Sequence, residues 1–109
     1  MNVSVVIPTY NRKPILEKCL KALEKQTLNN SISDYEIIVI DDGSTDGTSS
    51  WIKNNREILP HVVLYEQEHG GPALGRNLGV TRSKFEIIIF IDSDLIAVSY
   101  THLTLPTKA

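Results

Sequence analysis

Four short runs rich in Val and Ile recur along the chain, and their spacing constrains the fold more than any other feature. Each run is nearly continuous in hydrophobicity rather than alternating, and each is too short for a stable helix. Such runs are typical of strands buried on both faces of a parallel sheet, where β-branched side chains pack well. The predicted strands cover residues 3–7, 36–40, 62–65 and 86–91.

The segment between the first two predicted strands has the pattern of an amphipathic helix. Its apolar residues form one stripe at helical spacing, and Lys and Glu side chains lie between them in the sequence. We expect Asn11 to cap this helix and Pro14 to lie in its first turn, where proline is tolerated. The stripe consists of Ile15, Leu16, Cys19, Leu20 and Leu23.

Two further helices are predicted between the remaining strands. One covers about residues 48–56 and the other about residues 72–81. The latter contains Gly75 and Gly79, each of which lowers helix propensity by about 1 kcal/mol. We interpret both glycines as positions where the backbone closely approaches a strand or a ligand.

The alternation of strands and helices indicates an α/β fold with a mostly parallel sheet of about four strands and helical crossovers. A chain of 109 residues, 41% of them hydrophobic and 22% charged, suffices for one domain with a core. The formal net charge of −2 argues against a nucleic-acid partner, because phosphate binding needs a positive surface.

The cysteine count and the N-terminus predict where the chain resides. Cys19 is the single cysteine, which excludes an internal disulfide, and we expect it to be a buried apolar residue. The N-terminus leads directly into the first strand without a signal peptide, and no run reaches the ~18 apolar residues of a membrane span. We therefore expect a cytoplasmic chain without a membrane segment, while a longer parent protein could still be membrane-associated.

Asp92 and Asp94 follow the fourth predicted strand, at the end where α/β sheets bind their ligands. Residues two apart in an extended segment point to the same face, so both carboxylates can address one point. Such carboxylates repel each other unless a cation or a proton lies between them. Mn²⁺ or Mg²⁺ fits, because hard divalent ions bind carboxylates together with phosphate oxygens and water. The alternative is a solvated turn.

Asp41 and Asp42 follow the second predicted strand. A carboxylate in this place can accept a hydrogen bond from the ring N3–H of uracil, a donor that cytosine lacks, and can thereby select a base. The local sequence equally permits a structural role, in which Asp42 or Ser44 forms a turn or caps the second helix. Both interpretations stay open at this point.

Better-known binding loops do not match this chain. The segment that begins at Asp42 opens like an EF-hand calcium loop, but Lys53 occupies the position of the required Glu. Residues 70–77 have the spacing of a phosphate loop without its Lys-Ser/Thr pair, and the first strand is not followed by the glycine-rich loop of dehydrogenases. The histidines are scattered, and we assign no role to His61, His69 and His102.

Four segments at the predicted strand ends resemble the family 2 glycosyltransferases: VSVVIPTYNR, EIIVIDDGSTDGT, GGPALGRNLG and FIDSD. The resemblance extends from Val3 to about Leu95. It implies the Rossmann-like nucleotide-binding half of a GT-A fold. It further implies an inverting enzyme that transfers a sugar from a nucleotide-sugar donor, with UDP as the expected nucleotide, to an acceptor hydroxyl. A divalent metal, Mn²⁺ or Mg²⁺, is the implied cofactor.

The resemblance also implies roles for individual residues. Asp42 matches the aspartate that receives the uracil N3–H, Arg76 matches an arginine at the nucleotide-sugar pocket, and Asp94 matches the principal metal ligand. Gly75 replaces the usual Ala, which we expect to loosen its helix. Nucleotide-sugar contacts are implied for Pro8, Thr9, Tyr10, Asp41, Asp42, Arg76, Asp92 and Ser93, and metal contacts for Asp94 and Asp92.

The resemblance further predicts how much of an enzyme the chain represents. The general base of the family lies well beyond the D-x-D segment, so we expect an inactive front part of a longer enzyme. Residues 99–108 resemble a peptide translated from sequencing-adapter DNA. We predict a partial GT-A domain over residues 1–98 and a non-native tail over residues 99–109. A noncatalytic nucleotide-sugar-binding module and a Mg²⁺-dependent receiver-type signalling domain are the alternative functions.

Overall fold

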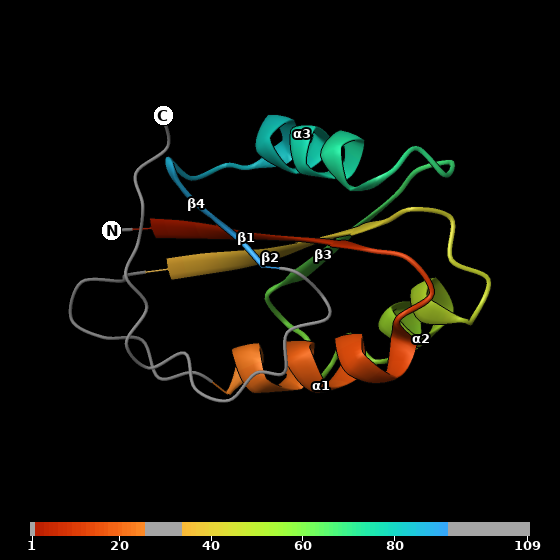
Figure 1. Ribbon diagram of the computed structural model, residues 1–109. Coiled ribbons are helices and arrows are strands. Elements are labelled where there is room, and N and C mark those ends of the chain that lie inside the picture. Colours follow the sequence, from red (N-terminus) through yellow and green to blue (C-terminus); the bar gives the residue numbers. More distant parts are fainter. Residues whose placement is uncertain (1, 26–33, 92–109) are drawn as a thin grey trace.

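The computed structural model describes residues 2–25 and 34–91 of the chain. Figure 1 shows a twisted sheet between two layers of helices. The strands are β1 (Asn2–Thr9), β2 (Asp34–Asp41), β3 (Val62–Glu66) and β4 (Ile87–Phe90). The helices are α1 (Lys13–Glu24), α2 (Thr48–Asn54) and α3 (Pro72–Arg82). The predicted order and type of these elements are confirmed.

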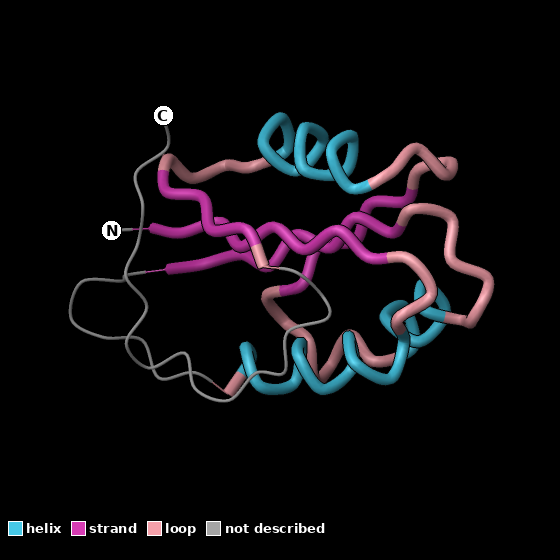
Figure 2. The backbone as a smooth tube through the Cα atoms, in the orientation of Figure 1, coloured by secondary structure: helices cyan, strands magenta, loops and turns pink. Residues whose placement is uncertain are grey.

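The sheet is parallel throughout the described part of the chain, with the strand order β3-β2-β1-β4 (Figure 2). In the central strand β1, Val5 pairs with Ile37 of β2 and with Ile89 of β4. Because β1 and β2 have neighbours on both edges and helices over both faces, nearly all of their residues are buried, as the continuous apolar runs predict.

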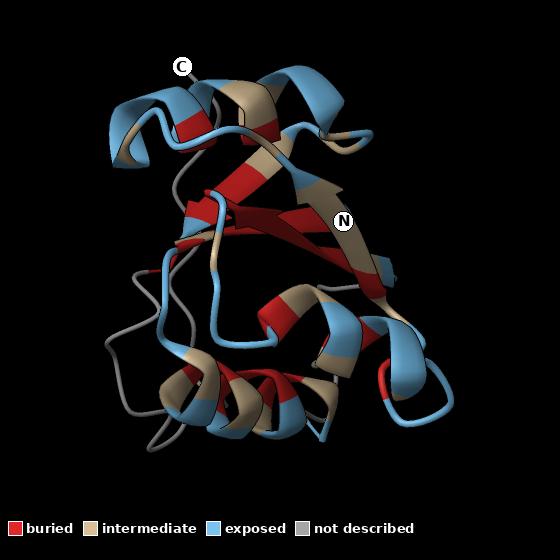
Figure 3. Cartoon of the chain, turned by 90° about the vertical axis from the view of Figure 1, so that its right-hand side faces the viewer, coloured by how far each residue is buried: buried red, intermediate tan, exposed pale blue. Residues whose placement is uncertain are grey.

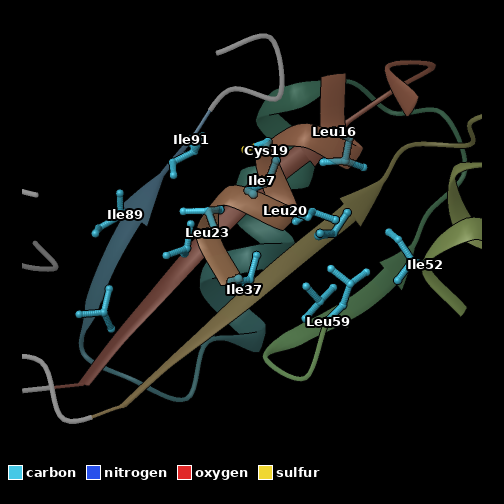
Figure 4. Packing of buried hydrophobic residues seen from close by; sticks show 14 residues of the cluster. Ile7, Leu16, Cys19, Leu20, Leu23, Ile37, Ile52, Leu59, Ile89 and Ile91 are labelled. Carbon is cyan, nitrogen blue, oxygen red and sulfur yellow. The ribbon is translucent and has the colours of Figure 1, made fainter. Parts of the chain in front are cut away.

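Helices cover the two faces of the sheet unequally. α1 and α2 lie on one face, and α3 lies on the other (Figure 1). The larger core forms between α1, α2 and the sheet, where Ile7, Leu20 and Ile37 are fully buried (Figure 4). Burying one such side chain stabilises the fold by about 1.5–3 kcal/mol. The predicted apolar stripe of α1 supplies this core with Leu16, Cys19, Leu20 and Leu23.

The first turn of α1 differs from the sequence prediction. Pro14 lies in this turn as expected, but the cap position belongs to Arg12, so the prediction of an Asn11 cap was wrong. Asn11 has a left-handed backbone with φ of 51°, and its Oδ1 accepts a hydrogen bond from the amide of Thr45 at 2.8 Å. Its amide side chain therefore binds the loop after β2 instead of the start of its own helix.

α3 approaches the sheet closely because it places glycines against it. A Cβ on Gly79 would lie 2.2 Å from Cγ1 of Val6, and one on Gly75 would lie 3.2 Å from Cβ of Pro8. Both glycines are buried, which confirms the interpretation of close backbone approach. By contrast, Leu74 on the same helix is 52% exposed. Gly75 does not interrupt the helix, which runs continuously to Arg82.

The carboxyl ends of all strands meet at one edge of the sheet. Figure 3 looks onto this edge, with buried strands in the middle and largely exposed loops around them. β2 lies on one side of β1 and β4 on the other, so the order of the strands reverses beside β1. Such a switch point opens a crevice in which α/β proteins bind ligands. In the described ranges, no helix is both long and apolar enough to cross a bilayer.

Candidate nucleotide site

A cavity of about 520 Å³ lies at this edge, next to the switch point between β1 and β4. Its volume is within the usual range for small-molecule sites. Five segments contribute to it: the end of β1 with the loop after it, the residue after β2, the loop between β3 and α3, the start of α3, and the end of β4. The lining residues are Pro8, Thr9, Tyr10, Arg12, Asp42, His69, Pro72, Arg76, Phe90 and Ile91.

Asp42 is the most heavily hydrogen-bonded carboxylate of the cavity. Its side chain is only 7% exposed. Oδ1 accepts hydrogen bonds from Gln67 Nε2 and from the amide of Gly70, both at 2.7 Å, and Oδ2 accepts one from the amide of Gly71 at 3.0 Å. His69 Nδ1 lies 2.9 Å from Oδ2 as a fourth donor. The loop between β3 and α3 is therefore wrapped around this one carboxylate.

This environment favours the ionised form of Asp42. Burial alone would raise the pKa of the carboxyl, but the hydrogen bonds from Gly70, Gln67 and Gly71 and the charge of His69 outweigh burial and lower the pKa. Asp42 is thus a fixed negative charge at neutral pH. Its side chain binds the loop of residues 67–71 instead of a local turn or the start of α2, and a nucleotide contact of Asp42 stays a prediction.

Asp41 has a different environment from its neighbour. It is 2% exposed and is not among the cavity-lining residues. Its Oδ1 accepts a hydrogen bond from the amide of Ser44 at 3.0 Å, and its Oδ2 accepts one from the hydroxyl of Ser49 in α2. Asp41 therefore shapes the turn after β2 and ties it to α2, and a nucleotide-sugar contact of Asp41 stays a prediction.

The loops that follow β1 and β2 bind each other on the outside of the cavity. Ser44 Oγ accepts a hydrogen bond from the amide of Asn11 at 2.9 Å, and Asp46 Oδ2 accepts one from the amide of Lys13 at 3.0 Å. Oδ1 of Asp46 also accepts a hydrogen bond from the hydroxyl of Thr48 at the start of α2. These contacts hold the segment that carries Tyr10 in a defined position relative to Asp42.

Four of the residues for which nucleotide-sugar contacts are predicted line the same cavity: Pro8, Thr9, Tyr10 and Arg76. Thr9 is 3% exposed, and its Oγ1 has no hydrogen-bond partner among residues 2–25 and 34–91. A buried hydroxyl without a partner costs about 1–3 kcal/mol, and a ligand can supply the missing partner. Arg76 lies in the second turn of α3 and is exposed, so its guanidinium is available to an anion beside the helix N-terminus.

Sequence reasoning left out His69 and Gln67. The imidazole of His69 lies against the ring of Tyr10, with 4.4 Å between the ring centroids, and it also contacts Asp42. The signal that identifies both residues is their position, because they follow β3 directly at the ligand-binding edge. The sequence around His69, which precedes two glycines, matches no binding or catalytic motif. Its ring reaches the cavity only because of the conformation of the loop in the folded chain.

The predicted metal ligands are not part of the described structure. Asp92, Ser93 and Asp94 lie outside the described residues and follow Ile91, which lines the cavity. Among the residues that are described, no group of three or more His, Cys, Asp or Glu side chains could hold a metal ion. Whether the D-x-D pair binds a cation therefore stays a prediction. The predicted tail over residues 99–109 likewise lies outside the described part of the chain.

A ligand-sized cavity at the switch point of a parallel sheet places the chain in the class of doubly wound α/β domains with a ligand-binding crevice. Comparison with known proteins specifies the class. Residues 4–100 match the family described as "Glycosyl transferase family 2", and the chain belongs to this family. The family assignment confirms the resemblance and removes the receiver-type alternative.

Individual relatives agree with the family assignment. The poly(ribitol-phosphate) beta-glucosyltransferase of Bacillus spizizenii is 38% identical over 96 residues, which cover 86% of this chain and 15% of the relative. Glycosyltransferase AglE of Haloferax volcanii is also 38% identical, over 93 residues that cover 84% of this chain and 30% of the relative. The chain thus spans 15% to 30% of the length of these two relatives.

Solved structures confirm the predicted GT-A type of fold. Residues 1-349 of S. aureus TarS in complex with UDP-GlcNAc superimpose with a TM-score of 0.74 at 33% identity, covering 86% of this chain and 27% of that TarS fragment. The mannosyltransferase PcManGT of Pyrobaculum calidifontis, in complex with GDP-Man and Mn²⁺, gives a TM-score of 0.74 at 33% identity. That match covers 84% of this chain and 27% of PcManGT.

Proposed function

We propose that the chain binds a nucleotide-sugar donor, preferably a UDP-sugar, in the cavity beside β1. In this proposal it forms the donor-binding part of an inverting glycosyltransferase that transfers the sugar to an acceptor hydroxyl. The observation that carries the proposal is the buried carboxylate of Asp42 next to the exposed ring of Tyr10 in one cavity. A base can stack on this ring and donate a hydrogen bond to this carboxylate.

The hydrogen bonds of Asp42 favour uracil as the base. A carboxylate has about four acceptor positions, and three of those on Asp42 are taken by Gln67, Gly70 and Gly71. These donors are backbone amides and a side chain of the same loop, so they stay in place. The fourth position, which His69 Nδ1 approaches to 2.9 Å in the free protein, matches the single N3–H donor of uracil. Guanine presents N1–H together with its exocyclic amino group, and this pair needs two adjacent acceptors.

The start of α3 is suited to the diphosphate of the donor. Arg76 lines the cavity and supplies a cation that can bind two phosphate oxygens at once. Pro72 is in the first turn of α3, and the free amides of a helix N-terminus attract anions. We therefore assign the base to Tyr10 and Asp42 and the phosphates to the α3 side of the cavity.

A divalent cation completes the proposal. Carboxylates such as Asp92 and Asp94 are suitable ligands for Mn²⁺ or Mg²⁺, and the relative PcManGT has been solved with Mn²⁺ and GDP-Man. When bound, such a cation stabilises the negative charge that the leaving diphosphate acquires. A noncatalytic donor-binding module uses the same contacts, so binding is the property to be measured first.

Calorimetric titration of the full chain with UDP tests the proposal. We expect UDP to bind more tightly than GDP, and Mn²⁺ to increase the affinity for UDP. Arg76→Ala should weaken UDP binding by roughly tenfold or more, because it removes a charged hydrogen-bond donor. The matched control is Arg82→Ala on the same helix, whose guanidinium lies over Tyr65 outside the cavity. A wild-type chain that binds neither UDP nor GDP would contradict the proposal.

A further inference from the structure

His69 makes two contacts in the cavity that together resemble those of a bound base. Its imidazole faces Tyr10, with 4.4 Å between the ring centroids and 39° between the ring planes. Its Nδ1 lies 2.9 Å from Oδ2 of Asp42 and 3.3 Å from the backbone carbonyl oxygen of Asp42. Both neighbours of Nδ1 are acceptors, so Nδ1 carries a proton and donates. His69 is therefore an aromatic ring that packs against Tyr10 at a tilt and donates an N–H to Asp42.

A uracil ring in this site needs the same two partners. It would stack on Tyr10 and direct its N3–H to the acceptor position that the loop amides leave open. That position is occupied by His69, whose ring lies on the same tyrosine. The base and the imidazole thus compete for one acceptor and one aromatic surface.

His69 also differs from the other donors to Asp42 in how easily it can leave. Its side chain is 65% exposed, whereas the carboxylate that it contacts is 7% exposed. The donors at Gly70 and Gly71 are backbone amides, and they cannot move without the whole loop. The imidazole can instead rotate into solvent about its own side-chain bonds. Because most of the imidazole faces solvent, its contact with Asp42 contributes little to stability, so displacement of the imidazole is easy.

We propose that His69 is an internal competitor for the nucleotide base: its imidazole occupies the base position in the free protein and leaves when the base binds. This inference rests on the proposed function, because it requires a nucleotide that reaches Asp42. A protein whose binding-competent state is only partly populated binds its ligand more weakly by that fraction. His69 therefore lowers the affinity for UDP and keeps Asp42 hydrogen-bonded when no donor is present.

Titration of the wild-type chain, His69→Ala and His69→Phe with UDP tests the sign of this effect. We expect both variants to bind UDP more tightly than the wild type, by roughly two- to fivefold, which corresponds to the loss of one partly exposed hydrogen bond. The Phe variant keeps a ring near Tyr10 but cannot donate to Asp42. Glu68→Gln, an exposed neighbour in the same loop, is the control and should bind UDP as the wild type does.

The opposite outcome has a clear meaning. If His69 instead forms a stacking surface for the base, His69→Ala binds UDP more weakly, and the inference is wrong. An unchanged affinity in both variants overturns it as well. Because the side chain is exposed, both substitutions should leave the fold intact, which amide NMR spectra of the variants can verify.

A direct measurement follows the imidazole itself. In the free protein we expect nuclear Overhauser contacts between the rings of His69 and Tyr10, and these should disappear on saturation with UDP. Contacts that persist in the UDP complex overturn the inference while the proposed function stands. If neither the wild type nor His69→Ala binds UDP or GDP, the proposed function fails and the competition fails with it.

Discussion

Asp41 and Asp42 are adjacent in the sequence, yet their carboxylates hold different parts of the chain. Asp41 binds the turn after β2 and Ser49 of α2, whereas Asp42 binds the loop before α3. Adjacent residues of an extended segment point to opposite faces, and this alternation separates the two side chains. Asp41 thereby holds the turn after β2 against α2, and Asp42 reaches the cavity.

The environment of Asp42 predicts a specific loss of stability in Asp42→Asn. The amide nitrogen of Asn is a donor, and it would meet the converging donors of Gly70, Gly71 and Gln67. We expect the free energy of unfolding at neutral pH to fall by about 1–3 kcal/mol, the cost of unsatisfied buried groups. Urea unfolding measures this change. The control is Glu57→Gln, which neutralises an exposed carboxylate outside this loop.

The same substitution should change the response to acid. The pKa of Asp42 in the folded protein is lower than its ordinary value of 3.8, so its ionised form stabilises the fold above that pH. This contribution disappears as the pH falls through the folded-state pKa. The wild type should therefore lose its advantage over Asp42→Asn in acid. A difference between the two proteins that stays constant from neutral to acidic pH would contradict the explanation.

Residue roles at the site were predictable only in part. The position of Asp42 after a buried strand indicates a ligand-binding edge, whereas the roles of Tyr10 and Arg76 were implied by the resemblance to the family. The local sequence does not distinguish Asp41 from Asp42, because the difference lies in which face of the sheet each side chain reaches. His69 was not predictable from its neighbours, because its partners come from segments distant in the sequence.

At the scale of elements, α3 is the helix whose packing depends most on small residues. Gly79 faces Val6, which is fully buried and branched at Cβ and so cannot move aside. Gly79→Ala should destabilise the fold by about 1–3 kcal/mol through overpacking. Gly75→Ala is the matched comparison on the same helix. Its Cβ would lie at the longer distance of 3.2 Å from Pro8 Cβ, and alanine favours the helix over glycine by about 1 kcal/mol.

Thermal or urea unfolding of both alanine variants measures the difference. The double variant Val6→Ala/Gly79→Ala should recover part of the loss attributed to the clash, since it removes the methyl groups that Gly79 approaches. If Gly79→Ala were as stable as Gly75→Ala, close approach of α3 to β1 would not explain the glycine at this position.

The elements themselves were largely predictable from local sequence. Continuous Val and Ile runs identify β1 and β2, and the apolar stripe with Pro14 identifies α1. The cap of α1 was not predictable, because the side chain of Asn11 accepts a hydrogen bond from the amide of Thr45 in another loop. This contact exists only after folding. Leu74 is exposed because the face of α3 that meets the sheet is formed by Gly75 and Gly79 together with Leu78, a division that apolar spacing alone does not indicate.

At the scale of the whole molecule, the two ends of the sheet have different chemistry. The carboxyl end holds the cavity, and the amino end holds a cluster of Glu24, Tyr35 and His61. His61 Nδ1 lies 2.6 Å from Oε1 of Glu24, and the rings of Tyr35 and His61 stack with centroids 4.1 Å apart. The cluster joins the end of α1 to the starts of β2 and β3. We therefore expect it to affect stability without affecting nucleotide affinity.

Tyr35→Phe tests this separation in alkaline solution. Burial, followed by the charge of Glu24, raises the pKa of Tyr35 from 10.0 to about 12. Between these values the unfolded chain loses the phenolic proton and the folded chain keeps it, so the free energy of unfolding falls as pH rises. Phe at this position has no proton to lose, and the variant should show a shallower decline.

Urea unfolding at a series of alkaline pH values compares the two proteins, with Tyr65→Phe as the control for loss of a tyrosine elsewhere. The affinity for UDP at neutral pH should be the same in the wild type and in Tyr35→Phe. Identical alkaline slopes would show that the cluster does not hold the phenolic proton, and a change in UDP affinity would show that the two ends of the sheet are coupled.

The loop of residues 67–71 has two attachments, since it encloses the carboxylate of Asp42 and leads directly into α3. Whatever alters the fit of the base will consequently displace the helix that carries Arg76, and the phosphates will be held differently. Redesigning the chain for another nucleotide by exchanging base-contacting residues alone should therefore misalign the diphosphate. A successful change of donor would have to replace the loop and the first turns of the helix as one unit.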